Sequence, residues 1–129
     1  SIGQGLPLAI GASIAKPVRP VITLHGDGGA MYTVQALWTQ ARENLNITNI
    51  IFANNSYEIL KIELSRVGAI KTGKRADSML SLDNPPIDWM SLSKSMGVPC
   101  YEPKKVEDFI KIFSSAVKEP GPTTIVVKL

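Results

Sequence analysis

Two polar clusters, each directly after a short apolar run, hold the residue types that could do chemistry. The first is His25-Gly26-Asp27-Gly28-Gly29-Ala30, after the apolar residues 21–24, and the second is Asn54-Asn55-Ser56-Tyr57, after residues 49–53. Residues 31–44 between them carry apolar side chains at helical spacing. This order reads as strand, glycine turn, helix, strand and asparagine turn. Ligands bind at the carboxyl ends of strands in an open parallel sheet, so we expect both clusters at one site.

The residue types favour a metal ion bound together with a phosphate group. Asp27 brings a carboxylate and Asn55 a neutral amide oxygen, and oxygen ligands in a site with few carboxylates suit Mg²⁺ held jointly with substrate phosphates. Glycines let the backbone approach a ligand closely, and the start of a helix offers unpaired N–H groups to an anion. The residues therefore predict a metal–diphosphate site that bridges two strand ends.

The motif Gly26-Asp27-Gly28, followed by Asn54-Asn55 after the next strand, resembles that of the thiamine diphosphate enzymes. Asn55 follows Asp27 by 28 positions, within one of the spacing usual in that family. Residues 1–12 are similar to the segment before the motif in acetolactate synthases and benzoylformate decarboxylases. Residues 35–39 and 42–45 resemble the family's intervening helix, and residues 86–97 its downstream helix. The resemblance implies an α/β fold with three α/β/α layers and a mostly parallel sheet. Residues 1–129 would be the C-terminal cofactor-binding domain, without the pyrimidine-binding and middle domains.

The resemblance also implies roles for individual residues. Asp27, the Asn55 side chain and the backbone carbonyl of Tyr57 would hold Mg²⁺, and backbone N–H groups would face the diphosphate. Gly29 stands where the family usually has serine or alanine, so its N–H is kept but a hydroxyl is absent. Ile2 falls where a bulky apolar residue bends the cofactor into a V. The implied cofactor-binding residues are Ser1, Ile2, Gly26, Asp27, Gly28, Gly29, Asn55, Tyr57, Glu58, Ile59 and Leu60.

An acetolactate synthase-like reaction is the activity that the resemblance favours. Such an enzyme decarboxylates pyruvate and transfers the two-carbon unit to a second 2-oxo acid, as in branched-chain amino acid biosynthesis. A benzoylformate-type decarboxylase, which releases the product instead, is the alternative, favoured by Ala36-Leu37-Trp38-Thr39. A non-catalytic subunit with the same fold is a third possibility, which the intact Asp27 and Asn55 oppose.

The family's activating glutamate has no counterpart in this chain. That glutamate comes from a separate pyrimidine-binding domain, usually of a second subunit, and Glu43, Glu58 and Glu63 lack its context. Lys61 stands where some decarboxylases carry an acid. We therefore expect no catalytic residue here, no activity from this chain alone, and a homodimer or homotetramer in the working enzyme.

Composition excludes several other classes. A chain of 129 residues with 44% hydrophobic and 19% charged residues suits one globular domain. The net charge of +3 is scattered apart from residues 71–75, which argues against nucleic-acid binding. The apolar runs are far short of the roughly 20 residues that span a bilayer. The single cysteine, Cys100, fits a reducing compartment and hence the cytoplasm. A generic nucleotide-binding domain lacks support, because no G-x-G-x-x-G fingerprint follows a strand.

The remaining patterns predict where elements lie. Because the chain opens without Met, already inside a motif, we expect it to be the C-terminal part of a longer protein. We interpret His25 as structural, Trp38 and Trp89 as core residues, Asp88 as a first-turn carboxylate, and Asp83 or Asn84 as a helix cap. Residues 68–84, without a clear period, would form either a lid or a solvated connection. We expect helices at 7–15, 31–44, 57–67, 87–96 and 106–117, and strands at 21–24 (buried on both faces), 49–53, 98–101 and 123–129.

Overall fold

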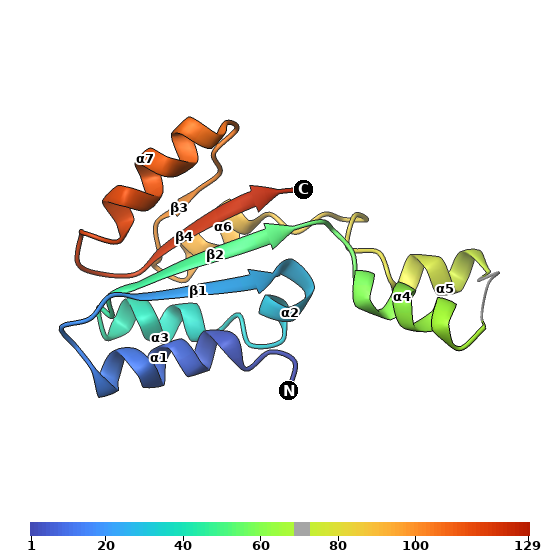
Figure 1. The fold of residues 1–129 in the computed structure, drawn as a ribbon, viewed down its shortest axis with the longest axis horizontal. Helices are drawn as coiled ribbons and strands as arrows, with labels where there is room; N and C mark the ends of the chain where they lie inside the picture. The colour runs from blue at the N-terminus through green and yellow to red at the C-terminus, as the bar shows by residue number, and fades with distance from the viewer. Residues whose placement is uncertain (69–72) are drawn as a thin grey trace.

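One parallel sheet organises the molecule. The structure, a computed structural model, describes residues 1–68 and 73–129. Its strands lie in the order β1-β2-β4-β3, and every pair of neighbours runs parallel. The bounds are β1 (Val21–Gly26), β2 (Ile47–Ala53), β3 (Cys100–Tyr101) and β4 (Thr123–Lys128). The predicted parallel α/β fold is therefore confirmed (Figure 1).

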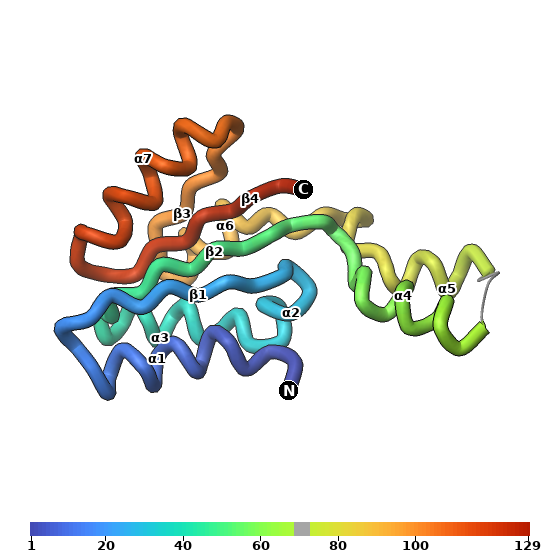
Figure 2. The backbone as a smooth tube through the Cα atoms, viewed as in Figure 1, coloured from blue at the N-terminus to red at the C-terminus, as the bar shows by residue number. Residues whose placement is uncertain are grey.

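Helices lie on both faces of this sheet (Figures 1 and 2). One face holds the main apolar core, in which Leu6, Leu37 and Trp89 from three helices pack with Ile51 and Val126. The other face carries α7. The helices are α1 (Gly5–Ala15), α2 (Asp27–Met31), α3 (Ala36–Arg42), α4 (Glu58–Arg66), α5 (Lys74–Met79), α6 (Trp89–Ser95) and α7 (Val106–Ala116). Among the residues that the structure describes, none of these helices has the length and apolar character needed to cross a membrane.

The handedness of the connections explains this layering. The chain passes from β1 through α3 to β2, and from β2 through α6 to β3, moving each time in the same direction across the sheet. The connection from β3 through α7 to β4 moves back. Right-handed crossovers place helices on one face for one direction and on the opposite face for the reverse. Hence α3 and α6 share a face, and α7 lies on the other.

The prediction that the first strand is buried on both faces is wrong. Burial alternates along β1, and Ile22 and Leu24 are 47% and 65% exposed. β1 is an edge strand, whereas β2 lies between β1 and β4 and is almost wholly buried. A continuous apolar run is typical of a strand covered on both faces, but it does not reveal whether both covering layers lie in this part of the chain.

The predicted helix over residues 31–44 is broken into two. α2 ends at Met31 and α3 begins at Ala36. Hydrogen bonds of the tighter i to i+3 type join the two, including Thr33 N–H to the Ala30 carbonyl at 3.3 Å. The buried side of α3 is formed by Ala36, Leu37 and Gln40. Trp38 lies off that side and is 52% exposed, with the Arg42 guanidinium 5.4 Å above its ring. The core role predicted for Trp38 is wrong, and that predicted for Trp89, 3% exposed, is confirmed.

The N-cap of α6 also differs from the prediction. Asp88 is the cap, and its Oδ1 accepts the Ser91 N–H at 3.0 Å, so neither Asp83 nor Asn84 has that role. Hydrogen bonds from Ser91 lower the pKa of the Asp88 carboxyl. Gly97, with φ of 81°, follows the helix as predicted and provides the left-handed position that ends it.

α4 and α5 form an arm that extends away from the sheet (Figure 1). α5 lies inside the segment predicted to be irregular, while residues 69–72 of that segment lie outside the described residues. The base of the arm is fixed by two hydrogen bonds, Tyr57 N–H to the Leu80 carbonyl at 2.9 Å and Leu82 N–H to the Asn55 carbonyl at 2.7 Å. The arm is therefore anchored at the asparagine turn that follows β2.

Candidate functional site

Asp27 is the centre of the site. It is the first residue of α2, directly after β1, and is 1% exposed. Its Oδ1 accepts the Gly28 N–H and its Oδ2 accepts the Asn55 N–H, both at 2.8 Å. One carboxylate thus joins the ends of β1 and β2, as the two polar clusters predicted.

Asn55 lies next to Asp27 in a strained turn. Its φ is 53°, a left-handed conformation that asparagine tolerates better than most residues. The hydrogen bond to Asp27 uses the Asn55 backbone, so the side-chain amide is left for another partner. The neighbouring Asn54 is exposed, and its Oδ1 accepts the Ser56 N–H at 3.1 Å. The turn therefore carries two consecutive side-chain amides, those of Asn54 and Asn55.

Tyr57 contributes its backbone carbonyl and its ring in different ways. The carbonyl accepts the Leu60 N–H at 2.9 Å and the Lys61 N–H at 3.4 Å as α4 begins, so a metal ion at this oxygen would share it with the first turn of the helix. The ring lies against Gly28: a Cβ there would be 2.7 Å from Tyr57 Cδ1 and Cε1. Gly28 is therefore required for close packing, while its N–H is already bonded to Asp27.

The other two glycines of the motif face open space. A Cβ placed on Gly26 or Gly29 would meet no atom within 4 Å. The backbone at the end of β1 and the start of α2 is consequently accessible to a bound group. The first turn of α4 could also contact a bound group, because Glu58 and Ile59 are exposed there. The Leu60 N–H is not available, since it donates to the Tyr57 carbonyl.

The N-terminal segment lies beside this site. The Thr33 hydroxyl, in the turn between α2 and α3, donates to the Gly3 carbonyl at 2.5 Å. Figure 1 shows the N terminus close to α2. Ser1 and Ile2 are exposed, with Ile2 63% accessible. Ile2 therefore presents an apolar side chain near the end of the sheet that carries Asp27, and Thr33, which sequence reasoning missed, fixes its position.

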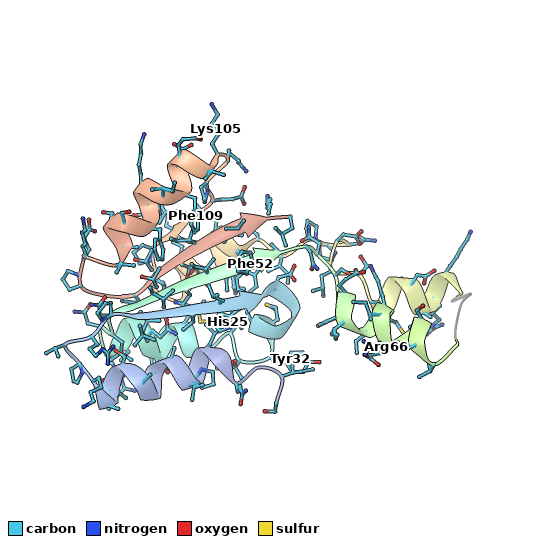
Figure 3. All side chains as sticks on the ribbon, viewed as in Figure 1. His25, Tyr32, Phe52, Arg66, Lys105 and Phe109 are labelled. Atoms are coloured by element: carbon cyan, nitrogen blue, oxygen red, sulfur yellow. The ribbon has the colours of Figure 1, made fainter. Side chains whose placement is uncertain are left out.

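His25 has a structural environment. The Thr23 hydroxyl donates to Asn49 Oδ1 at 3.1 Å, so its oxygen accepts the hydrogen of His25 Nε2 at 2.7 Å. The ring fills the space above Gly5, where a Cβ would be 2.3 Å from His25 Cε1. Figure 3 labels His25 between β1 and α1. Burial lowers the pKa of His25. These contacts support the predicted structural role.

A pocket adjoins the site on the β4 side. It has a volume of about 300 Å³, and Asn55, Trp89 and Lys128 are among its lining residues. Lys128 Nζ lies 3.0 Å from Glu102 Oε2, and hydrogen bonds from Lys104 and Lys128 hold the pKa of Glu102 below its usual value. Asn55 thus bonds to the Asp27 carboxylate through its backbone and also lines this pocket.

Comparison with known proteins identifies the family. Residues 1–127 match the family described as thiamine pyrophosphate enzyme, C-terminal TPP binding domain. This chain belongs to that family. It is 45% identical over 126 residues to a Mycobacterium tuberculosis protein with the provisional name acetolactate synthase large subunit IlvX, covering 97% of this chain and 24% of that protein. The benzoylformate decarboxylase of Pseudomonas aeruginosa is 30% identical over 126 residues, which cover 98% of this chain and 22% of that enzyme.

Solved structures of the family share the fold of this thiamine diphosphate-binding domain. The thiamine diphosphate-dependent 4-hydroxybenzoylformate decarboxylase of Rhodococcus jostii superimposes with a TM-score of 0.87 at 35% identity, covering 98% of this chain and 23% of that chain. The domain thus spans about a quarter of the length of these relatives. The expected family and three-layer fold are both confirmed.

The donor atoms of the domain fit the cofactor and metal that the family implies. Within the described residues, no group of three or more His, Cys, Asp and Glu side chains could hold a metal ion. A metal here would therefore need amide and carbonyl oxygens besides Asp27, and the turn after β2 supplies both kinds. Mg²⁺ accepts such oxygen sets when phosphate oxygens complete them, and the open backbone at Gly26 and Gly29 gives the diphosphate space.

Proposed function

We propose that this domain binds thiamine diphosphate through Mg²⁺ as part of an enzyme that acts on 2-oxo acids. The observation that carries the proposal is the buried Asp27 carboxylate, fixed by the backbone of both Gly28 and Asn55. Burying an ionised carboxylate is costly unless it is hydrogen-bonded or binds a cation. Its place at two strand ends matches the position where ligands bind parallel sheets.

Each residue of the site has a distinct task in this proposal. Asp27, the Asn55 side chain and the Tyr57 carbonyl would hold Mg²⁺, whose charge would offset that of the diphosphate. Backbone N–H groups of Gly29, Glu58 and Ile59 face the phosphate oxygens, while Gly26 leaves room for them. Ser1 and Ile2 pack beneath the rings of the cofactor. When bound, thiamine diphosphate would supply a carbon nucleophile for a 2-oxo acid and would accept the electron pair that the departing CO₂ leaves behind.

An acetolactate synthase-like carboligase is the favoured reaction class. The supporting observation is the 45% identity to a protein provisionally named as an acetolactate synthase large subunit. A benzoylformate-type decarboxylase is the second candidate, supported by 35% identity to a 4-hydroxybenzoylformate decarboxylase of the same fold. A non-catalytic subunit is the third, and the intact set of oxygen donors opposes it.

The full enzyme needs parts outside this domain. The proposal includes a pyrimidine-binding domain, usually from a second subunit, whose glutamate activates the cofactor. A homodimer or homotetramer in the cytoplasm is the expected assembly, and this domain alone is expected to be inactive. We assign no catalytic residue to it, because its residues hold the metal and diphosphate instead of the reacting atoms.

Product analysis separates the three candidates. The full-length protein containing these residues is incubated with thiamine diphosphate, Mg²⁺ and either pyruvate or benzoylformate, with the Asp27→Asn variant and the 129-residue chain as controls. Acetolactate from pyruvate supports the carboligase, and benzaldehyde from benzoylformate supports the decarboxylase. Failure to turn over either 2-oxo acid, with no cofactor binding, would assign the chain to the non-catalytic class.

A further inference from the structure

We propose that His25 is a positioning residue for the cofactor, because a chain of hydrogen bonds from two buried amides fixes its ring against Gly5 and thereby sets the N-terminal segment that carries Ile2. The chain, which we call the His25 relay, consists of Gln40, Asn49, Thr23 and His25. This inference rests on the proposed function, in which the rings of thiamine diphosphate lie over Ile2. It extends that function to four side chains that the metal–diphosphate site does not use.

The relay begins at an amide whose orientation is set by the sheet. Asn49 Nδ2 donates to the Thr123 carbonyl on β4 at 3.3 Å and to Gln40 Oε1 at 2.8 Å. A backbone carbonyl can only accept, so the Asn49 NH₂ group lies on that side and Oδ1 on the other. Gln40 Nε2 donates to the same Oδ1 at 3.3 Å, and both side chains are wholly buried. The position of Asn49 Oδ1 is therefore fixed.

The direction of the next two hydrogen bonds follows from that orientation. Because Asn49 Oδ1 is an acceptor, the Thr23 hydroxyl gives its one proton to it, at 3.1 Å. The Thr23 oxygen must then accept the proton of His25 Nε2, at 2.7 Å. Burial lowers the pKa of His25, which favours the neutral ring, and a neutral ring protonated on Nε2 has no proton on Nδ1. A carbonyl on β4 thus determines the tautomer of a histidine on β1.

The proton-free edge of the ring lies against the start of α1. A Cβ on Gly5 would be 2.3 Å from His25 Cε1 and 2.7 Å from Nδ1, but 3.6 Å from Nε2. The N–H groups of a first helical turn have no acceptor within the helix, and the side chain of Gln4, the N-cap of α1, accepts none of them. A bare Nδ1 is compatible with this helix end, whereas an Nδ1–H group would face other donors.

Two glycine contacts hold the segment before α1. Gly5 admits the His25 ring, and a Cβ on Gly3 would be 2.6 Å from Tyr32 Cβ. Gly3 also has a φ of 82°, which glycine adopts without strain. The segment is therefore held by the end of β1 and by the turn between α2 and α3, within three residues. Ile2 directly precedes these contacts and is 63% exposed, so its position depends on both of them.

The relay supplies orientation as well as bulk. An apolar side chain would fill the space above Gly5 without the cost of burying polar groups. A fully hydrogen-bonded network instead fixes one arrangement of its members, here one orientation and one tautomer of the His25 ring. A shift of about 1 Å in a group that orients a reactant can lower a rate about a hundredfold. The support beneath the cofactor rings is therefore a place where such precision has an effect.

Two ligands separate this role from that of the metal–diphosphate site. Calorimetry on the full-length protein measures the binding of thiamine diphosphate and of inorganic diphosphate, each with Mg²⁺. Both ligands would use the metal and the diphosphate groups, but only the first has rings for Ile2 to support. Thr23→Val removes the relay hydroxyl at similar volume. We expect it to lower the affinity for thiamine diphosphate about tenfold and to leave the affinity for inorganic diphosphate unchanged.

Thr124→Val is the matched control for stability. Thr124 is wholly buried on β4, and its hydroxyl oxygen accepts the Ser93 hydroxyl at 2.9 Å. The substitution therefore removes a buried hydrogen bond of the same sheet outside the relay. We expect it to lower the urea midpoint at least as much as Thr23→Val does, and to change the affinity for neither ligand. Equal weakening of thiamine diphosphate binding by the two variants would assign the effect to global stability and overturn the positioning role.

A second set of variants tests the contact between His25 and Gly5. Gly5→Ala would place a methyl group 2.3 Å from the ring, so we expect weaker binding of thiamine diphosphate. In His25→Ala/Gly5→Ala the ring is absent, and the double variant should bind no more weakly than His25→Ala. Gly11→Ala, in the same helix where a Cβ meets nothing within 4 Å, should leave the affinity unchanged. Losses that simply add in the double variant would show that ring and glycine act separately, contrary to the proposal.

The outcomes distinguish this inference from the proposed function. Equal loss of both ligands in Thr23→Val would place the effect at the metal–diphosphate site, and no loss of either would show that the relay does not position the segment. Each result would overturn the role of His25 while the binding of thiamine diphosphate by the parent protein still supported the proposed function. A parent protein that binds neither ligand would contradict the proposed function itself, and this inference with it.

Discussion

Asp27 Oδ2 accepts the backbone N–H of Asn55 at 2.8 Å, and this single bond joins the ends of two neighbouring strands. The other oxygen of the carboxylate, Oδ1, accepts the Gly28 N–H, so both oxygens of Asp27 are hydrogen-bonded to the backbone. An ionised carboxylate has about four lone-pair sites, which leaves acceptor capacity for a cation. The fold therefore orients the candidate metal ligand before any metal binds.

We predict that the Asn55 side chain binds the metal ion, whereas its backbone N–H and its positive φ maintain the turn. Asn55→Gly keeps the N–H and tolerates φ of 53°, so we expect near-normal stability and at least a tenfold loss of Mg²⁺ affinity. Asn55→Ala is expected to lose the same affinity and in addition about 1 kcal/mol of stability, because alanine is disfavoured in the left-handed region. Calorimetric Mg²⁺ titration and urea unfolding of the full-length protein measure the two effects.

Asn54→Ala is the matched control for that pair. It removes the acceptor of the Ser56 N–H but leaves Asn55 in place, so we expect Mg²⁺ affinity to be retained. If Asn54→Ala abolishes Mg²⁺ binding while Asn55→Gly does not, then the neighbouring amide is the ligand and our assignment is displaced by one residue.

Gly28 is predicted to be irreplaceable for packing. Gly28→Ala would bring a methyl group within 2.7 Å of the Tyr57 ring, and such overpacking costs about 1–3 kcal/mol. Gly29→Ala, where a Cβ meets nothing within 4 Å, is expected to be neutral or slightly stabilising in the helix. Urea unfolding of both variants compares them, and equal stabilities would contradict the close contact between Gly28 and Tyr57.

A buried amide pair is predicted to stabilise the sheet against α3. Asn49 Nδ2 donates to Gln40 Oε1 at 2.8 Å, and both side chains are wholly buried. Gln40→Leu leaves the Asn49 amide without this partner, which costs about 1–3 kcal/mol. The double variant Gln40→Leu/Asn49→Leu should recover part of that loss. Denaturant unfolding of the two variants tests this, and additive losses would argue against a coupled pair.

The stability of the domain is predicted to fall in mild acid through His25. Burial lowers the pKa of folded His25 from the ordinary 6.5, so below that pH the unfolded state binds the extra proton first. The stabilisation from neutral His25 is complete above about pH 6.5 and is lost as the pH falls toward the folded pKa. His25→Gln should show a shallower fall in melting temperature between pH 7.5 and 5.5. Parallel curves for variant and parent would contradict this.

Much of the fold followed from the sequence because its patterns are local. The β-branched runs of β2 and β4 and the periodic apolar residues of α7 needed no tertiary information to predict. The Asp27 and Asn55 positions at strand ends were enough to bring them together, since parallel strands share a carboxyl edge.

The misplaced elements depended on contacts that a pattern does not contain. The break between α2 and α3 accompanies the bond from Thr33 to the Gly3 carbonyl, which joins residues 30 positions apart. The exposure of Ile22 and Leu24 results from the edge position of β1. The sequence predicted that the Gly28 and Leu60 N–H groups face the diphosphate. In the structure they donate to Asp27 and Tyr57 instead, and no sequence pattern reveals those hydrogen bonds.

Calorimetric titration of thiamine diphosphate into the assembled full-length protein, with and without Mg²⁺, tests the central claim most directly. We expect binding that requires Mg²⁺ in the parent protein. In Asp27→Asn, which is nearly isosteric but lacks the charge, we expect an affinity loss of at least a hundredfold. Binding that is equally tight without Mg²⁺, or unchanged by Asp27→Asn, would contradict the claim that the Asp27 carboxylate anchors the cofactor through a metal ion.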